Sequence, residues 1–393
     1  MQTFYIIGIS DDRNQFLSPE IRNLVSQGKV FSGGKRHHEL VHAYLPEDAV
    51  WIDITVPLDA VFCRYEEHSE IIVFASGDPL FFGFANTVMR KLPSAKIILF
   101  PTFNSLQMLA HRILLPYQEM QTLSLTGRPW DAFDSALIRG DKLIGVLTDR
   151  EKTPATIAAR MLEYGYDNYR MIVGEALGNG EEESVRTFSL EEASQSAFRF
   201  PNCLILQRNK VHPRPFGIPE SEFHLLNGRN RMITKMPVRL LTLSMLTLRE
   251  KKSFWDIGFC TGSVSIEAKL QFPELKVTAF EQRTEGKELM ARNSRKFGTP
   301  GITTVMGDFL ETELGGLPAP DAVFIGGHGG KMIEILQKIK EVLLPDGVIV
   351  FNSVSEESKA LFTKGITQIN KKVTQCTRIA VDTFNPIEIM RAE

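Results

Sequence analysis

The sequence predicts an α/β protein with two small α/β lobes in its N-terminal half and one doubly wound, Rossmann-like sheet in its C-terminal half. Short apolar runs typical of buried strands alternate along the chain with stretches of helical spacing. The 393 residues, of which 43% are hydrophobic and 23% charged, suffice for two or three domains. We therefore expect mainly parallel sheets covered by helices.

Apolar runs predict the elements of both halves. Ser18 and Pro19 are typical of the start of a helix and Gly28 of its end. A helix is also expected over 154–164. The expected strands are 4–9, 50–54, 71–75 and 96–100 in the first lobe, 122–125, 142–148 and runs near 171 and 204 in the second, and 252–257, 276–280, 303–306, 321–325 and 347–351 in the C-terminal half.

A proline-rich stretch separates the two halves. Residues 208–221, RNKVHPRPFGIPES, contain three prolines and show neither helical nor strand periodicity, as expected of an interdomain linker. We expect lobes over about 1–115 and 116–207, a linker over 208–223 and a C-terminal domain over 224–393.

Composition argues against several classes of protein. The net charge of −2 and the pI of about 6.5 indicate no general attraction to nucleic acid. Four separated cysteines without a CxxC pair predict neither a disulfide framework nor a zinc site. No uncharged run is long enough for a membrane helix, and the N-terminus does not resemble a signal peptide. We expect a soluble, cytoplasmic protein without a bound metal.

The C-terminal half contains a pattern typical of nucleotide binding. A glycine-rich turn, Gly258 to Gly262, follows a strand and leads into a helix that begins near Ser263. Glu281 ends the next strand, 23 positions after Gly258, near the spacing at which a carboxylate meets a ribose. Asp308 follows a later strand and is placed to accept a hydrogen bond from an adenine amino group. A site for NAD would prefer GxGxxG, so an NAD oxidoreductase is less favoured.

The segments ITKMPVR, WDIGFCTGSVSIEA, PDAVFIGGHGG and LPDGVIVFNSVSEES resemble, in this order, the CbiT-type class I methyltransferases of cobalamin biosynthesis. The turn matches DxGxGxG, except that Cys260 replaces the middle glycine. The resemblance implies that S-adenosylmethionine is the cofactor and that Gly326, Gly327 and His328 line the substrate pocket. The cofactor-binding residues that it implies are Thr234, Asp256, Gly258, Gly262, Ser263, Glu281 and Asp308.

The N-terminal half has a second set of motifs, GGKRHHEL, ASGDPLFFG, PTFNSLQ and LTGR. In ASGDPLFFG, Asp78 is expected to cap a helix whose first turn contains Pro79. The ordered set resembles the class III tetrapyrrole methyltransferases of the CbiE type over about residues 1–207. The resemblance implies a cofactor cleft formed by Ser76, Gly77, Asp78, Asn104, Ser105 and Thr126.

Substrate residues are expected near the same motifs. Arg36, His37 and Arg128 suit a substrate rich in carboxylates, because guanidinium groups form paired hydrogen bonds to carboxylates. His37 and His38 do not predict a metal site, because adjacent side chains rarely converge on one ion. An exposed loop is the alternative interpretation of residues 36–38.

Together the two resemblances imply methylation of a precorrin or cobalt-precorrin at C5 by the N-terminal half and at C15 by the C-terminal half, with loss of the C12 acetate carboxyl. They also make a homo-oligomer plausible. No catalytic base can be assigned from spacing. Two alternatives stay open: an RNA or protein methyltransferase with an N-terminal recognition module, and a non-catalytic regulator that binds S-adenosylmethionine.

Overall fold

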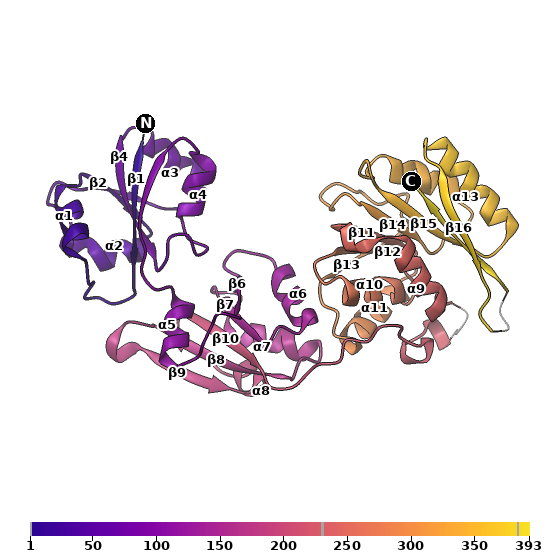
Figure 1. The fold of residues 1–393 in the computed structure, drawn as a ribbon, viewed down its shortest axis with the longest axis horizontal. Coiled ribbons are helices and arrows are strands. Elements are labelled where there is room, and N and C mark those ends of the chain that lie inside the picture. Colours follow the sequence, from indigo (N-terminus) through magenta and orange to yellow (C-terminus); the bar gives the residue numbers. More distant parts are fainter. Residues whose placement is uncertain (1, 229–231, 383–384) are drawn as a thin grey trace. The chain divides into compact units, whose positions relative to one another are not determined.

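The computed structural model describes residues 2–228, 232–382 and 385–393. The chain forms two compact units (Figure 1). One comprises Met1–Arg128, Lys142–Ala159 and Tyr169–Asn209, and the other comprises Pro129–Asp141, Arg160–Asn168 and Lys210–Glu393. Within the described residues, no helix is long and apolar enough to cross a membrane.

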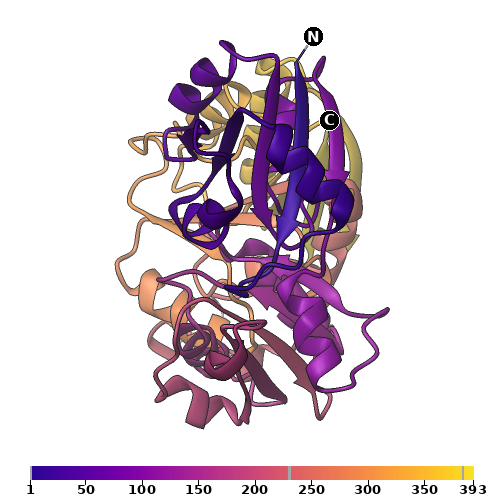
Figure 2. The ribbon, with the colours of Figure 1, turned by 90° about the vertical axis from the view of Figure 1, so that its left-hand side faces the viewer.

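The first sheet is entirely parallel, with strand order β3-β2-β4-β1-β5. Its indigo and purple strands and flanking helices face the viewer in Figure 2. The four expected strands and the helix after Ser18 are confirmed, whereas the short β2 was not expected. The strands are β1 (Thr3–Ile9), β2 (Val30–Gly33), β3 (Val50–Asp53), β4 (Glu70–Ser76) and β5 (Lys96–Phe100), and the helices are α1 (Pro19–Gln27), α2 (Lys35–Val41), α3 (Leu58–Tyr65) and α4 (Ala85–Lys91).

Two local expectations in this lobe are wrong. Asp78 does not cap a helix that starts at Pro79, because residues 77–84 form turns and α4 begins at Ala85. Instead, the Asp78 carboxylate accepts from the Leu80 N–H at 2.9 Å, and this local bond competes with helix formation. Residues 36–38 are not an exposed loop but belong to α2.

The second sheet, of order β6-β7-β10-β8-β9, is mostly antiparallel and is the exception to the mainly parallel sheets that were expected. Only β6 and β7 are parallel. The connection between β8 and β9 is short, and parallel pairing would need a crossover of a dozen or more residues. The elements are β6 (Gln121–Ser124), β7 (Leu143–Leu147), β8 (Tyr169–Glu175), β9 (Ser184–Phe188), β10 (Asn202–Arg208), α5 (Ser105–Arg112), α6 (Asp131–Arg139), α7 (Pro154–Glu163) and α8 (Leu190–Ser194).

The third sheet, of order β13-β12-β11-β14-β15-β17-β16, confirms the doubly wound C-terminal half. Five parallel strands match the expected ones, and the antiparallel pair β16 and β17 at one edge was not expected. The elements are β11 (Ser253–Ile257), β12 (Lys276–Glu281), β13 (Ile302–Met306), β14 (Ala322–Ile325), β15 (Val348–Ser353), β16 (Val373–Ile379), β17 (Ile387–Ala392), α9 (Met236–Met245), α10 (Ser263–Gln271), α11 (Glu285–Lys296), α12 (Met332–Lys340) and α13 (Glu356–Gln368).

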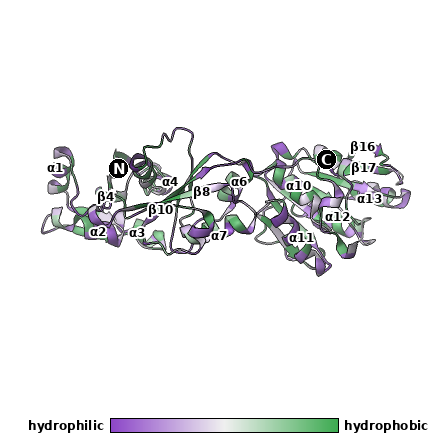
Figure 3. Cartoon of the chain, turned by 90° about the horizontal axis from the view of Figure 1, so that it is seen from below, coloured by the Kyte–Doolittle hydropathy of each residue, from purple (hydrophilic) through white to green (hydrophobic). Residues whose placement is uncertain are grey.

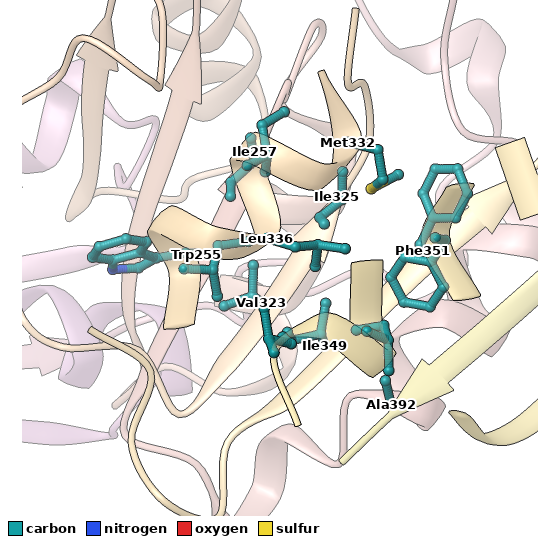
Figure 4. Packing of buried hydrophobic residues seen from close by; sticks show 14 of the residues in the cluster. Trp255, Ile257, Val323, Ile325, Met332, Leu336, Ile349, Phe351 and Ala392 are labelled. Carbon is teal, nitrogen blue, oxygen red and sulfur yellow. The ribbon is translucent and has the colours of Figure 1, made fainter. Parts of the chain in front are cut away.

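Apolar packing on both faces fixes the central strands of this sheet. Trp255, Val323 and Ile349 pack with Leu336 and Met332 of α12 in one buried cluster (Figure 4). Helices at the surface, such as α11 and α13, have both hydrophilic and hydrophobic faces (Figure 3). The core therefore holds the carboxyl ends of β11, β12 and β14 at fixed positions.

A buried ion pair joins α9 to α10. Arg239 and Glu267 have fully buried side chains, and the guanidinium Nε donates to the carboxylate at 2.5 Å. The other guanidinium nitrogens donate to the carbonyl oxygens of Ile218 and Thr234, and the Gly217 N–H donates to Glu267. Residues 217–218, within the expected linker, are thereby held against α9 and α10.

We expect Glu267→Gln to lower the free energy of unfolding by about 3–5 kcal/mol, because it leaves the Arg239 charge buried without a counter-charge. Urea unfolding of the full chain measures the effect. Glu163→Gln is the matched control, because it breaks the half-exposed pair with Arg295 and should cost about 0–1 kcal/mol. Equal effects of the two substitutions would contradict the expectation.

Candidate cofactor sites

The turn between β11 and α10 has a backbone shape that requires glycine at two positions. Gly258 and Gly262 have φ angles of 78° and 75°. A Cβ at Gly258 would lie 2.9 Å from the backbone nitrogen of Gly327, and one at Gly262 would lie 2.5 Å from the Met290 sulfur. The turn can therefore bring its backbone close to a ligand and to the neighbouring loop after β14.

Glu281, at the end of β12, is held beside this turn. Its side chain is buried and accepts from the Cys260 N–H at 2.9 Å and from the Arg283 N–H at 3.0 Å. The Arg283 guanidinium lies 3.4 Å from the same carboxylate. These contacts fix the carboxylate at the mouth of the turn, where two ribose hydroxyls could donate to it.

A cavity of about 740 Å³ opens at the carboxyl ends of β11, β12, β13 and β14. Gly262 is not among its lining residues and acts instead through the shape of the turn. All the other residues expected at this site line the cavity: Thr234, Asp256, Gly258, Ser263, Glu281, Asp308, Gly326, Gly327 and His328.

Two buried polar atoms in the lining residues fit a cationic ligand with hydrogen-bonding groups. Asp256 is buried, and only one of its carboxylate oxygens is bonded, to the Ser265 hydroxyl at 2.6 Å. Its other oxygen and the Thr261 hydroxyl have no hydrogen-bond partner among the described residues. Burial raises the pKa of Asp256 to about 7, although the hydrogen bond from Ser265 acts in the opposite direction. A cation such as a sulfonium or ammonium group would restore the charged carboxylate.

Asp308 has partners that an adenine would have to share. Its carboxylate accepts from the Leu310 N–H and from the Lys331 ammonium, each at 2.9 Å. The Lys331 hydrogen bond lowers the pKa of Asp308, so the group is a carboxylate at neutral pH. Its role towards adenine stays a prediction.

Sequence reasoning missed several side chains of this cavity. Lys331 and Arg283 pair with the two expected carboxylates, and Asn352 lines the wall at the end of β15. Asn352 could have been found by the rule that polar residues at the carboxyl ends of parallel strands face the ligand. The two cationic residues carry no comparable signal in the sequence.

In the first lobe, three loops meet at the carboxyl ends of β1 and β4. A Cβ at Gly8 would lie 1.9 Å from the Gly77 carbonyl oxygen, and one at Gly77 would lie 2.7 Å from the Asn104 Cα. Asn104 caps α5 by accepting from the Gln107 N–H at 2.9 Å, and Ser105 begins that helix. Gly77, Asn104 and Ser105 are thus brought together, and the N-terminus of α5 lies beside Gly77.

His37 contacts the same loop. Its Nδ1 accepts from the Gly34 N–H at 3.2 Å, so the proton lies on Nε2, which is 2.8 Å from the Ser76 hydroxyl oxygen. Burial lowers the pKa of His37 to about 4, with a further contribution from Arg36. Expected as a substrate residue, His37 is therefore a neutral hydrogen-bond donor to an expected cofactor residue.

The remaining expected residues of this half have separate surroundings. The Thr126 hydroxyl donates to the Thr148 carbonyl at 3.0 Å. Arg36 forms an ion pair with Asp11, whereas the guanidinium of Arg128 lies 4.9 Å from the ring centre of Phe82. No three His, Cys, Asp or Glu side chains of the described residues gather as a metal site.

Comparisons with known proteins agree with both sets of motifs. A family model described as a precorrin methyltransferase domain matches residues 227–392. A precorrin-6Y C(5,15)-methyltransferase (decarboxylating) of Sinorhizobium sp is 33% identical over 371 residues, which are 91% of this chain and 86% of the relative. The protein of the same name from Mycobacterium tuberculosis is 25% identical over 93% of this chain and 90% of its own.

A shorter relative matches less than half of the chain. The cobalt-precorrin-6B C(15)-methyltransferase (decarboxylating) of Salmonella typhimurium is 33% identical over 162 residues, which are 41% of this chain and 83% of the relative.

The fold, the cofactor sites and these matches define an S-adenosylmethionine-dependent methyltransferase. Within that class, the chain belongs to the precorrin-6Y C5,15-methyltransferase (decarboxylating) family of cobalamin biosynthesis.

We expect cofactor affinity at the C-terminal site to rise with pH up to about 7 and to level off above it. Asp256 must lose its proton to bind a cation, and its pKa without ligand is about 7. When binding requires the loss of one proton, the affinity changes by at most about tenfold per pH unit. Calorimetric titration with S-adenosylmethionine between pH 5.5 and 8 measures the dependence. The isosteric variant Asp256→Asn should remove it, and a slope that persists in this variant would contradict the assignment.

Proposed function

We propose that the chain methylates a precorrin or cobalt-precorrin at two ring carbons, C5 in the N-terminal half and C15 in the C-terminal half, and removes the carboxyl of the C12 acetate in the latter. The observation that carries the proposal is the presence of two separate glycine-shaped loops at strand ends, one at Gly77 and one at Gly258. Relatives with this name align along both halves.

We assign one of the two methylation reactions to each half of the chain. We assign C15 methylation and decarboxylation to about residues 224–393, because these residues contain the CbiT-type motifs and match the precorrin methyltransferase domain over 227–392. We assign C5 methylation to about residues 1–207, which contain the class III motifs. The expected cytoplasmic location and homo-oligomeric state stay predictions.

In the C-terminal half, the cofactor supplies a methyl group that is already activated on a positive sulfur. The residues of the chain therefore need only hold and orient the reactants and exclude water. Glu281 is placed for the ribose hydroxyls and Asp256 for a cationic group. The buried cluster beneath the cavity keeps both carboxylates in place.

We assign to His328 the role of holding the acetate of the substrate. Its Nδ1 accepts from the Gly330 N–H at 3.2 Å, so the proton lies on Nε2 and can be donated to a carboxylate. Burial lowers the pKa of His328, which keeps it neutral at physiological pH. Gly326 and Gly327 line this edge of the cavity and, because they have no side chains, leave room for the ring there.

In the N-terminal half, Arg128 is the better placed of the two expected arginines for an acidic ring. No carboxylate among the described residues pairs with its guanidinium, which lies against Phe82. Arg36 is already paired with Asp11. A flat macrocycle could contact the Phe82 ring while its carboxylates accept from Arg128.

We expect Glu281→Ala to abolish most cofactor binding in the C-terminal half and to leave C5 methylation intact. Losing a charged hydrogen-bond acceptor should weaken that site about tenfold or more. Asp78→Ala should have the converse effect. Mass spectrometry of the products separates the two activities, because C15 methylation is accompanied by loss of carbon dioxide.

The matched control is Asp59→Ala, which removes a largely exposed carboxylate on α3 and should change neither product. Simultaneous and equal loss of both products in folded Glu281→Ala would contradict separate sites. A corrin precursor of unchanged mass after incubation with the folded wild-type protein would contradict the proposed function.

A further inference from the structure

Cys260 has a backbone conformation in which a side chain is disfavoured. Its φ is 51°, in the left-handed region, at the middle of the turn between β11 and α10. Glycine adopts this conformation without the clash between Cβ and the backbone. A side chain at this position is best explained by a contact that glycine could not make.

The thiol makes such a contact with a distant segment. Its Sγ lies 3.0 Å from the Met232 carbonyl oxygen, to which it donates across 28 positions of sequence. Burial and, to a smaller extent, the nearby Glu281 together raise the pKa of Cys260 to about 11. The thiol therefore keeps its proton and remains a donor at neutral pH.

Both ends of this hydrogen bond belong to the wall of the C-terminal cavity. Residues 232–235 line one side, and Gly258 and Cys260 line another. The same segment is held a second time, where the Thr234 carbonyl accepts from the Arg239 guanidinium at 2.7 Å. The Cys260 N–H meanwhile donates to Glu281. One residue thus connects the turn, the carboxylate and the segment.

We propose that Cys260 is a positioning residue that fastens residues 232–235 across the cofactor cavity and thereby strengthens cofactor binding. The inference rests on the proposed function of this cavity. A wall that is already ordered loses less conformational freedom when the ligand binds, so the affinity is higher. A thiol is a weak donor, and the contribution is correspondingly modest.

Three substitutions in the full-length chain separate the effect of the donor from that of the Cβ atom. Cys260→Ser keeps both, Cys260→Ala keeps only the Cβ, and Cys260→Gly keeps neither. In calorimetric titrations with S-adenosylmethionine, we expect the alanine and glycine variants to bind about two- to fivefold more weakly at one of two sites. The serine variant should stay within about twofold of the wild type.

Thermal unfolding provides a second readout that should follow a different order. The glycine variant should have a higher Tm than the alanine variant, because it relieves the disfavoured φ. Cofactor affinity would then depend on whether residue 260 has a hydrogen-bond donor, whereas Tm would depend on whether it has a Cβ atom. Cys63→Ala, which removes an exposed thiol on α3, is the control and should change neither quantity.

The results that would overturn the inference are distinct from failure of the proposed function. Wild-type affinity in Cys260→Ala, or equal weakening in the serine and alanine variants, would show that the donor does not matter and would overturn this inference alone. A folded wild-type protein that binds no S-adenosylmethionine would overturn the proposed function and this inference together.

Discussion

The buried pair of Arg239 and Glu267 is the constraint on which the C-terminal site depends. Two charges are removed from water there, which is tolerable only because nearly every hydrogen-bonding group finds a partner. The partners are backbone groups at 217–218 and 234, so one electrostatic interaction fixes the end of the linker and a wall of the cavity. A purely apolar contact could bury as much surface, but it would not set the orientation of these backbone groups, because apolar contacts are not directional.

The candidate cofactor sites of the two halves share one feature, although the two folds differ. In each, a parallel sheet presents its carboxyl ends to a loop in which glycine permits very close approach, Gly77 against Asn104 and Gly258 against Gly327. The charge around the two loops differs. The N-terminal loop is contacted by the neutral His37, whereas the C-terminal turn is flanked by the carboxyl groups of Asp256 and Glu281.

The sequence was sufficient for the features that depend on local pattern. The five parallel strands, the turn at Gly258 and the position of Glu281 follow from apolar runs and spacing. The partly polar β16 and the four-residue β2 gave no such signal. The contact of His37 with Ser76 could not be predicted, because it depends on β2 lying next to β4 and thus on pairing of distant segments. The same holds for the bond from Cys260 to Met232.

The electrostatics of the C-terminal cavity follow from two acidic groups that lie beside the same turn. Glu281 accepts from two backbone N–H groups and lies beside the Arg283 guanidinium. One oxygen of Asp256 accepts from the Ser265 hydroxyl, whereas the other has no hydrogen-bond partner among the described residues. The negative charge of Glu281 adds to the effect of burial in raising the pKa of Asp256. A carboxylate that has no counter-charge among the described residues favours a ligand that brings one. S-Adenosylmethionine is such a ligand, because it carries cationic groups that could meet this carboxylate.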